Sequence, residues 1–299
     1  LPRLREVVIE RLDWTTPGDL PENLAWTFHE PSELMLESLP ATSQAITLRR
    51  GSLTKRLCLG LKAHQTRSLC LEHCDAHGDT WPWNAETLQE VALHGIPAML
   101  VDRAIADQLN ITSLGEVKGT LNLKRPAARA VLQGIQHLEV QQGDHIFEAL
   151  QHSDEPFPTL QTLKITAHGS TDAAALACVL GYATQLRALA LHAVSPDSRE
   201  VKGIPWSRLN ALSLRNSTID RHNLSEQGAP FLELLDVSDT PLRCVLDLTP
   251  STPRLCALFA SGVKQLVSTA KCLPHAKLRL LDLSCSNLTE DAARALFHD

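Results

Sequence analysis

Equivalent leucines recur at one constant interval in this sequence, and this regularity most constrains how the chain can fold. Each of these leucines opens a segment in which a second apolar residue follows three positions later and a third two positions after that. The leading residues are Leu186, Leu209, Leu232, Leu255 and Leu278, so the residue number rises by 23 at every step. Equal intervals in such a series are very unlikely to arise by chance, and self-similarity at a fixed period indicates a repeat architecture. Segments that start at Ile135 and Leu160 extend the series with slightly longer intervals.

The repeated segment predicts a short strand followed by a turn. Its clearest copy is LRLLDLSCSNL, which starts at Leu278 and follows the pattern L-x-x-L-x-L-x-x-N/C-x-L. The middle of the pattern alternates with period two, so its leucines point to one side and the intervening residues to the other. One such coil cannot bury its apolar side alone, whereas stacked coils share a continuous core.

In this pattern the chain resembles the leucine-rich repeat family, closely over residues 135–299 and loosely over the first 130. The resemblance implies an α/β fold: a leucine-rich-repeat solenoid, which is a curved right-handed superhelix with a parallel β-sheet on its concave face. Short helices, turns and extended segments are then expected on the convex face. Because proline interrupts several connecting segments, long helices are not expected throughout.

We expect a single solenoid over residues 1–299, with regular repeats of about 23 residues in 135–299 and degenerate repeats in 1–134. In the degenerate part we predict strands near Leu4–Ile9, at Ile46–Leu48, at Leu69–Leu71, at Ile96–Val101 and around Leu121–Leu123. An insertion is expected near 78–90, and Leu57–Leu61 is read as a short strand on the convex side. The four tryptophans of this part (Trp14, Trp26, Trp81 and Trp83) are assigned to core packing ahead of partner binding.

The stretch SLCLEHCDAHGD, from Ser68 to Asp79, looks like a metal site because two cysteines and two histidines lie close together. Aligned on Leu69 and Leu71, however, Cys74 occupies the ninth position of the pattern. The family resemblance implies that this residue faces inward and satisfies backbone groups at the turn. A second pair of ligands at a familiar zinc spacing is also missing. We therefore predict a turn residue and no metal.

The sequence carries no motif of a known catalytic site. It lacks G-x-S-x-G, a phosphate-binding loop, a dinucleotide glycine fingerprint and H-E-x-x-H. Its 13 histidines are spread along the chain, with no base and orienting group recognisable beside any of them. We therefore expect no catalytic residues, no enzyme activity and no cofactor.

Charge and hydropathy narrow the classes of partner. The net charge of −6 and the absence of a basic run argue against nucleic-acid binding. The longest apolar stretch, 173–183, is much shorter than the roughly 20 residues of a membrane helix, so no membrane span is expected.

The compartment stays open between intracellular, which we favour, and secreted or cell-surface. The eight cysteines are scattered and form no dense disulfide framework. Against an intracellular location stand the N-x-S/T sequons at Asn110, Asn216, Asn223 and Asn287, which are glycosylation acceptors if the protein is secreted. Since the sequence does not begin with Met, we expect a mature, trimmed or partial chain.

The candidate binding surface is the concave face, formed by the outward positions of each strand. Its charged and aromatic members give a basic group followed by an acidic one, typical of a modest protein-binding face. The candidate residues are Lys164, Arg187, His192, Arg215, Glu233, Asp236, Asp239, Phe259, Arg279 and Asp282. The alternative is that these are solvated strand positions without a partner.

The sequence thus favours a non-catalytic protein–protein interaction or scaffold module that binds a protein partner, as a subunit of a larger assembly. One alternative is a secreted or cell-surface recognition ectodomain for glycan, lipid or a foreign ligand, which the sequons favour. The other is the substrate-recognition part of a larger enzyme, such as a ubiquitin-ligase effector.

Overall fold

The structure is a computed structural model of the 299-residue chain. It describes residues 6–9, 24–31, 42–76, 82–83, 86–119, 121, 126–141, 157–169, 180–181, 183–194, 204–217, 228–241, 252–263, 277–286 and 290.

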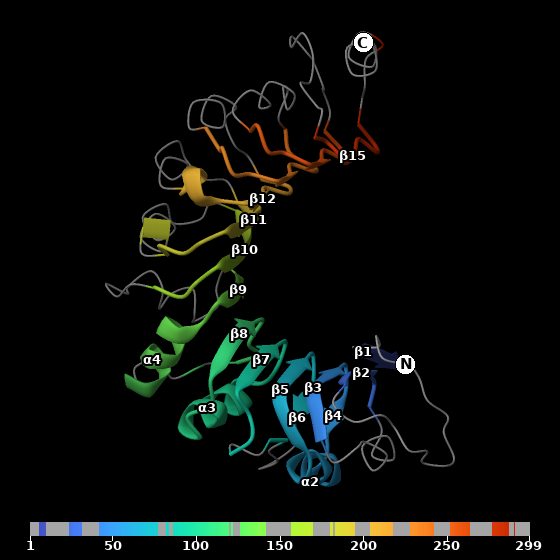
Figure 1. The fold of residues 1–299 in the computed structure, drawn as a ribbon, viewed down its shortest axis with the longest axis vertical. Coiled ribbons are helices and arrows are strands. Elements are labelled where there is room, and N and C mark those ends of the chain that lie inside the picture. The colour runs from blue at the N-terminus through green and yellow to red at the C-terminus, as the bar shows by residue number, and fades with distance from the viewer. Residues whose placement is uncertain are drawn as a thin grey trace. The chain divides into compact units, whose positions relative to one another are not determined.

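The protein is α/β, with a large parallel sheet of 13 strands and few helices (Figure 1). The chain divides into two compact units, Leu1–His137 and Leu138–Asp299.

Six strands of the first unit follow one another in parallel in the order β1-β2-β3-β5-β7-β8. Their bounds are β1 Glu6–Ile9, β2 Ala25–His29, β3 Thr42–Arg49, β5 Gln65–Glu72, β7 Glu90–His94 and β8 Ile111–Gly115. Two short strands, β4 Ser52–Leu53 and β6 Asp75–Ala76, pair separately. The strands predicted near Ile9, at Ile46–Leu48 and at Leu69–Leu71 are confirmed. Of the strand predicted around Leu121–Leu123, Leu121 lies outside any strand, and residues 122–125 lie outside the described residues.

The predicted strand at Ile96–Val101 is wrong. Residues Ala98–Ala106 form helix α3, and the strand lies earlier, at Glu90–His94. Within α3, Leu100, Val101, Ala104 and Ile105 are buried, which is the spacing of one helix face. Because the register pairs Leu69 with Val91, this coil is much shorter than the mistaken strand implied. The expected insertion near 78–90 falls partly outside the described residues.

The convex strand predicted at Leu57–Leu61 is also wrong, because Lys55–Ala63 form helix α2. Thr54 caps this helix, and its hydroxyl accepts the Leu57 N–H at 3.2 Å. Leu57, Cys58 and Leu61 are buried on one side of the helix, whereas Leu59 is exposed. In Figure 1, α2, α3 and α4 (Pro126–Gly134) lie on the same side of the strands of this unit.

The core of the first unit contains the leucines of the strands and two of the tryptophans. Trp26 and Trp83 are buried, as predicted, and Trp26 stacks on Phe28 with ring centroids 6.2 Å apart. Trp14 and Trp81 lie outside the described residues. Cys74 is fully buried, and its thiol donates to the carbonyl oxygens of Leu48 at 3.4 Å and Glu72 at 3.6 Å. The prediction that Cys74 is a turn residue that satisfies backbone groups is therefore confirmed.

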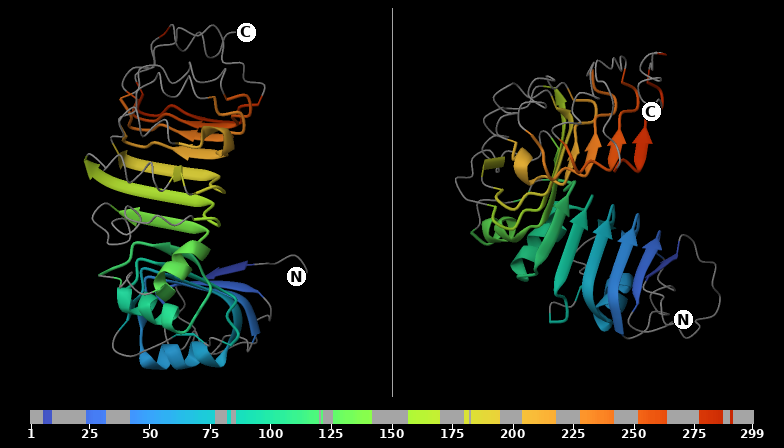
Figure 2. Two further views of the ribbon diagram at one scale, coloured as in Figure 1. Left: turned by 90° about the vertical axis from the view of Figure 1, so that its left-hand side faces the viewer. Right: turned by 45° about the horizontal axis from the view of Figure 1, so that its top comes forward.

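In the second unit, neighbouring strands from β11 on pair residues that are 23 positions apart, which is the interval between the leading leucines. The strands are β9 His137–Gln141, β10 Thr162–Gly169, β11 Ala188–Val194, β12 Ala211–Ser213, β13 Leu234–Asp236, β14 Ala257–Phe259 and β15 Leu280–Asp282. From β11 on, neighbouring strands are parallel and keep the register of the repeat, so Leu189, Leu212, Leu235, Leu258 and Leu281 stand side by side. The alignment of Leu212, Leu235 and Leu281 on successive parallel strands, which the repeat predicts, is confirmed, and Figure 2 shows the arrows of β12–β15 pointing the same way.

The turn after each of these strands has one backbone conformation. Counted from the leading leucine, the residue at the eighth position has φ between 54° and 70°, in the left-handed region. These residues are Ala193, Asn216, Asp239, Gly262 and Cys285. The N–H of each of the first four donates to the seventh-position carbonyl of the next coil, at 2.7–3.0 Å. The turns thus form a second hydrogen-bond ladder beside the sheet.

Among the helices that the described residues form, none is long and apolar enough to cross a bilayer. The remaining helical element is η1, the 3-10 turn Trp206–Arg208, whose Trp206 is buried.

Candidate functional site

The outward residues of the second-unit strands form two parallel columns, which we call the open face. The fifth-position column is Glu139, Lys164, Ala190, Ser213, Asp236, Phe259 and Asp282, and the seventh-position column is Gln141, Thr166, His192, Arg215, Ser238, Ser261 and Ser284. Strand register places the fifth-position residues from Lys164 to Asp282 on neighbouring strands in that order. The alternation of buried leucines with half-buried residues in β11–β14 produces this face.

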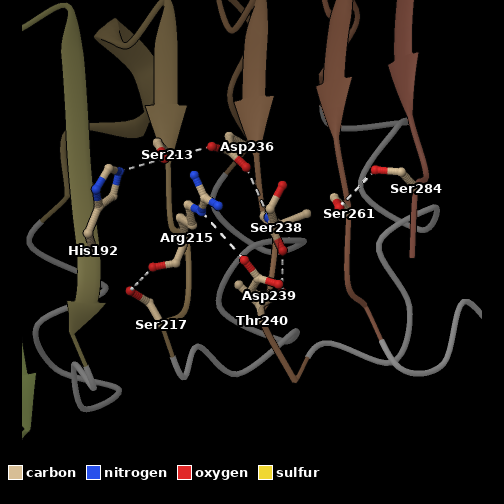
Figure 3. Close-up of polar contacts among 11 residues, drawn as sticks. His192, Ser213, Arg215, Ser217, Asp236, Ser238, Asp239, Thr240, Ser261 and Ser284 are labelled. Atoms are coloured by element: carbon tan, nitrogen blue, oxygen red, sulfur yellow. Dashed lines mark hydrogen bonds and ion pairs between the residues drawn. The ribbon is translucent and has the colours of Figure 1, made fainter. Parts of the chain in front are cut away.

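Three strands are linked across the open face by a chain of side-chain hydrogen bonds (Figure 3). The Ser213 hydroxyl donates to Asp236 Oδ2 at 3.1 Å, and His192 Nε2 lies 3.0 Å from Ser213 Oγ. Because the serine proton is directed to Asp236, His192 must donate through Nε2, which fixes the neutral tautomer. Burial lowers the pKa of His192, the charge of Lys164 lowers it further, and Asp236 acts in the opposite direction. The imidazole is therefore neutral at pH 7.

This arrangement does not activate a serine nucleophile. In a serine triad the histidine accepts the serine proton and a carboxylate holds the histidine. Here Ser213 stands between the other two residues and donates its proton to Asp236. The chain of bonds instead orients His192 and Asp236 as fixed polar groups on neighbouring strands.

Two cations of the open face are paired with carboxylates. The Lys164 ammonium forms an ion pair with Glu139. Arg215 Nε lies 3.4 Å from Asp239 Oδ2, with both side chains about half exposed. The Asp239 carboxylate packs tightly against the next turn, where a Cβ at Gly262 would lie 2.3 Å from Oδ1.

Two further carboxylates face solvent beside an aromatic ring. Asp236 and Asp282 each accept the N–H of the residue two positions later, at 3.0 and 2.9 Å. The bonds that Asp282 accepts from Ser284 lower the pKa of this carboxyl. Phe259 lies between the two carboxylates in the strand register and is half-buried. Ser261 and Ser284 are hydrogen-bonded to each other at 3.0 Å, so the neighbouring surface is small and polar.

The structure separates three of the sequence-predicted residues from the rest. Arg187, Glu233 and Arg279 are exposed and occupy the second position of their coils, where the strands begin. The Arg187 guanidinium donates to the Arg208 carbonyl at 3.3 Å. The other seven candidates lie on the open face or at the turn that follows it.

Sequence reasoning missed the central role of Ser213. A serine in a strand column carries no distinctive signal, and its two partners lie about one coil away in the chain. The register could have placed the three residues on neighbouring strands, but the hydrogen bonds depend on side-chain rotamers that periodicity does not fix.

Metal chemistry has little support in the described residues, among which no group of three His, Cys, Asp or Glu side chains is arranged to hold an ion. Burial, followed by the charge of Glu72, raises the pKa of Cys70 to about 12. Burial also raises the pKa of Cys74. Both thiols are therefore protonated at pH 7. His77 lies outside the described residues.

The sequons and the cysteines are the residues that bear on the compartment of the protein, and the structure describes some of each. The sequon residues Asn110 and Asn216 are exposed, and the Asn110 amide donates to the Gln89 carbonyl at 2.9 Å. Asn223 and Asn287 lie outside the described residues. The described cysteines Cys58, Cys70, Cys74, Cys256 and Cys285 are free.

No family model matches the sequence, and a search of curated proteins found no significant match.

Proposed function

We propose that this chain is a leucine-rich-repeat solenoid that acts as a non-catalytic binding or scaffold module for a protein partner. In this proposal the parallel sheet is the concave face of the solenoid, and the open face is the binding surface. The residues that make contact are Lys164, His192, Arg215, Asp236, Asp239, Phe259 and Asp282. The family resemblance of the repeats suggests that the ligand is another protein.

The observation that carries the proposal is the His192–Ser213–Asp236 chain, together with the Arg215–Asp239 pair on the same strands. These bonds hold polar side chains at fixed points of a sheet whose register is itself fixed by buried leucines. A surface ordered before contact loses little side-chain entropy on binding, so more of the interaction energy appears as affinity.

Charge reversal on the open face tests the proposal. We expect Arg215→Glu combined with Asp236→Lys to weaken binding of the partner by about ten-fold or more, because each new charge faces a like charge of the partner. The partner is first captured from the native source and identified by mass spectrometry, and its affinity for purified wild type and variant is then measured by calorimetry.

A matched control is Lys62→Glu with Glu90→Lys, which exchanges the same charges at exposed positions of the first unit. The control must bind as the wild type does, and circular dichroism must show that both variants remain folded. A partner that binds the open-face variant with undiminished affinity would rule out this face as its site.

A second candidate function is a secreted or cell-surface recognition ectodomain. The exposure of Asn110 and Asn216 favours it, since a glycan must project into solvent. Mass spectrometry of the protein from its native source tests this candidate: glycan mass on Asn110 or Asn216 supports the ectodomain, and unmodified asparagines argue against it.

A further inference from the structure

A row of unpaired cations runs along the beginnings of the second-unit strands. The repeat brings together residues that flank each leading leucine, so side chains one or more coils apart in the sequence lie along one edge of the sheet. We call this row the basic rim. Its members are Arg187, Arg208, Arg254, Lys277 and Arg279, all of them exposed.

The cations of the basic rim differ from those of the open face in how they are held. Arg187 donates to the Arg208 carbonyl at 3.3 Å, and Arg208 donates to the Thr184 carbonyl at 3.0 Å. Within the described part of the chain, none of the five rim cations forms an ion pair with a carboxylate. Lys164 and Arg215 on the open face are paired. The positive charge of these five side chains is therefore not neutralised by a carboxylate of the described residues in direct contact with them.

An aromatic side chain lies within the rim. Phe231 precedes the leading Leu232 as Arg208 and Arg254 precede theirs, and 44% of it is exposed. The Arg254 guanidinium lies over its ring, 4.9 Å from the centroid. An exposed ring with a cation stacked on it offers apolar contact area beside positive charge. Glu233 is the one acidic residue of the described chain among those that flank the leading leucines from Leu186 to Leu278.

We propose that the basic rim is a second docking surface, which takes an acidic segment of a partner protein carrying an apolar residue. Carboxylates of the segment would pair with Arg208, Arg254 and Lys277, and the apolar residue would pack on Phe231. Neighbouring strands stand about 4.8 Å apart, so the rim from β11 to β15 spans about 19 Å, the length of about six residues of extended chain. A short segment is enough to reach from end to end.

The observations favour a peptide over RNA. The carboxylate of Glu233, in the middle of the rim, would repel the continuous charge of a phosphate backbone, whereas a peptide can place a neutral residue opposite it. The described part of the rim has a single exposed ring, whereas single-stranded nucleic acids are generally bound on several aromatic platforms. This inference goes beyond the proposed function, because its surface shares no residue with the open face.

The test is fluorescence anisotropy with a labelled peptide of about twelve residues, in which Glu alternates with Ser around one central Phe. The same peptide with Gln in place of Glu is the uncharged comparison. At about 50 mM salt we expect the acidic peptide to bind the intact protein, and at about 300 mM salt we expect binding to weaken, because the rim is exposed to screening. The Gln peptide should bind at least about ten-fold more weakly.

Variants then locate the site. Arg208→Glu with Arg254→Glu should weaken peptide binding by about ten-fold or more, since two attractions become repulsions. The milder pair Arg254→Gln with Lys277→Gln should give a smaller loss and serves if the first variant fails to fold. The matched control Lys55→Glu with Lys62→Glu makes the same charge change at exposed positions of the first unit and should bind as the wild type does.

Four results would overturn the inference: no binding of the acidic peptide, equal binding of the Gln peptide, an equal loss in the control variant, or tighter rim-dependent binding of an oligouridine of the same length. The open-face variant Arg215→Glu with Asp236→Lys should leave peptide binding unchanged. This separates a failure of the rim from a failure of the proposed function.

Discussion

At the scale of single residues, a serine at the ninth position of one coil satisfies backbone groups in the turn of the coil before it. Ser217 is fully buried; its hydroxyl accepts the Val194 N–H at 3.1 Å and donates to the Leu191 carbonyl at 2.7 Å. Ser286 does the same for Val263 and Ala260, at 3.2 and 2.6 Å. The valine side chains at positions 194 and 263 cannot form such hydrogen bonds. Ser217 therefore satisfies the turn at Val194, and Ser286 satisfies the turn at Val263.

We therefore expect Ser217→Ala to lower the free energy of unfolding by about 1–3 kcal/mol, because it leaves a buried N–H and a buried carbonyl without their side-chain partner. Urea denaturation of the second unit measures the change. Ser284→Ala is the control: it removes one hydroxyl at an exposed site and should cost less than about 0.5 kcal/mol. Equal costs for the two substitutions would contradict the role assigned to Ser217.

At the scale of elements, the left-handed turns repeat as regularly as the strands do, yet the residues that occupy them are unequal. Gly262 adopts positive φ without steric cost, and Asn216 and Asp239 tolerate it. Ala193 and Cys285 adopt the same conformation, with φ of 55° and 56°, against the clash of Cβ with the backbone. The ladder thus imposes the conformation on residues that disfavour it.

Replacing Ala193 by glycine should for this reason stabilise the protein, by up to about 1 kcal/mol, since it removes the Cβ clash at positive φ. Thermal melting measures the effect. Ala190→Gly, three residues earlier in the middle of β11, is the matched control and should destabilise by about 0.5–1 kcal/mol. If both substitutions destabilise to the same extent, the turn at Ala193 is not strained.

The elements of the second unit could be predicted from the sequence and those of the first unit only in part. From β11 to β15 every strand is separated from the next by the same interval, so one register locates all five strands. In the first unit the interval changes from coil to coil. The register pairs Trp26–Ile46, Ile46–Leu69, Leu69–Val91 and Ala92–Ser113 differ in residue number by 20, 23, 22 and 21 in turn. Without a constant period, the apolar run around Val101 fits a buried strand or a buried helix equally well.

At the scale of the whole molecule, the mild net charge of −6 conceals how the charges of the second unit are arranged. No run of basic residues exists in the sequence, and its absence argued against nucleic-acid binding. The repeat nevertheless places Arg208, Arg254 and Lys277 at equivalent edge positions of the strands. On strands β11 to β15 charge must be read down the columns of the sheet, because residues adjacent in space are 23 positions apart in the sequence.

The stacking of buried leucines on neighbouring strands also determines which strands a substitution in the core should destabilise. Leu212 is fully buried and stands between Leu189 and Leu235 on neighbouring strands. We expect Leu212→Asp to destabilise by several kcal/mol, since it places a carboxyl group in the shared core. Hydrogen exchange measured by mass spectrometry should show loss of amide protection in β11, β12 and β13. Strands β3, β5 and β7, which belong to the other compact unit, should keep theirs.

The control is Asn210→Asp, which adds the same charge at an exposed position two residues earlier and should change neither melting nor exchange. A melting curve unchanged by Leu212→Asp would contradict the core assignment. Uniform loss of protection over both units would instead show that the chain unfolds as one cooperative body. The expected result, loss confined to the coils around β12, follows if stability is a sum of contacts between neighbouring coils, because a defect in one coil then acts directly only on the coils beside it.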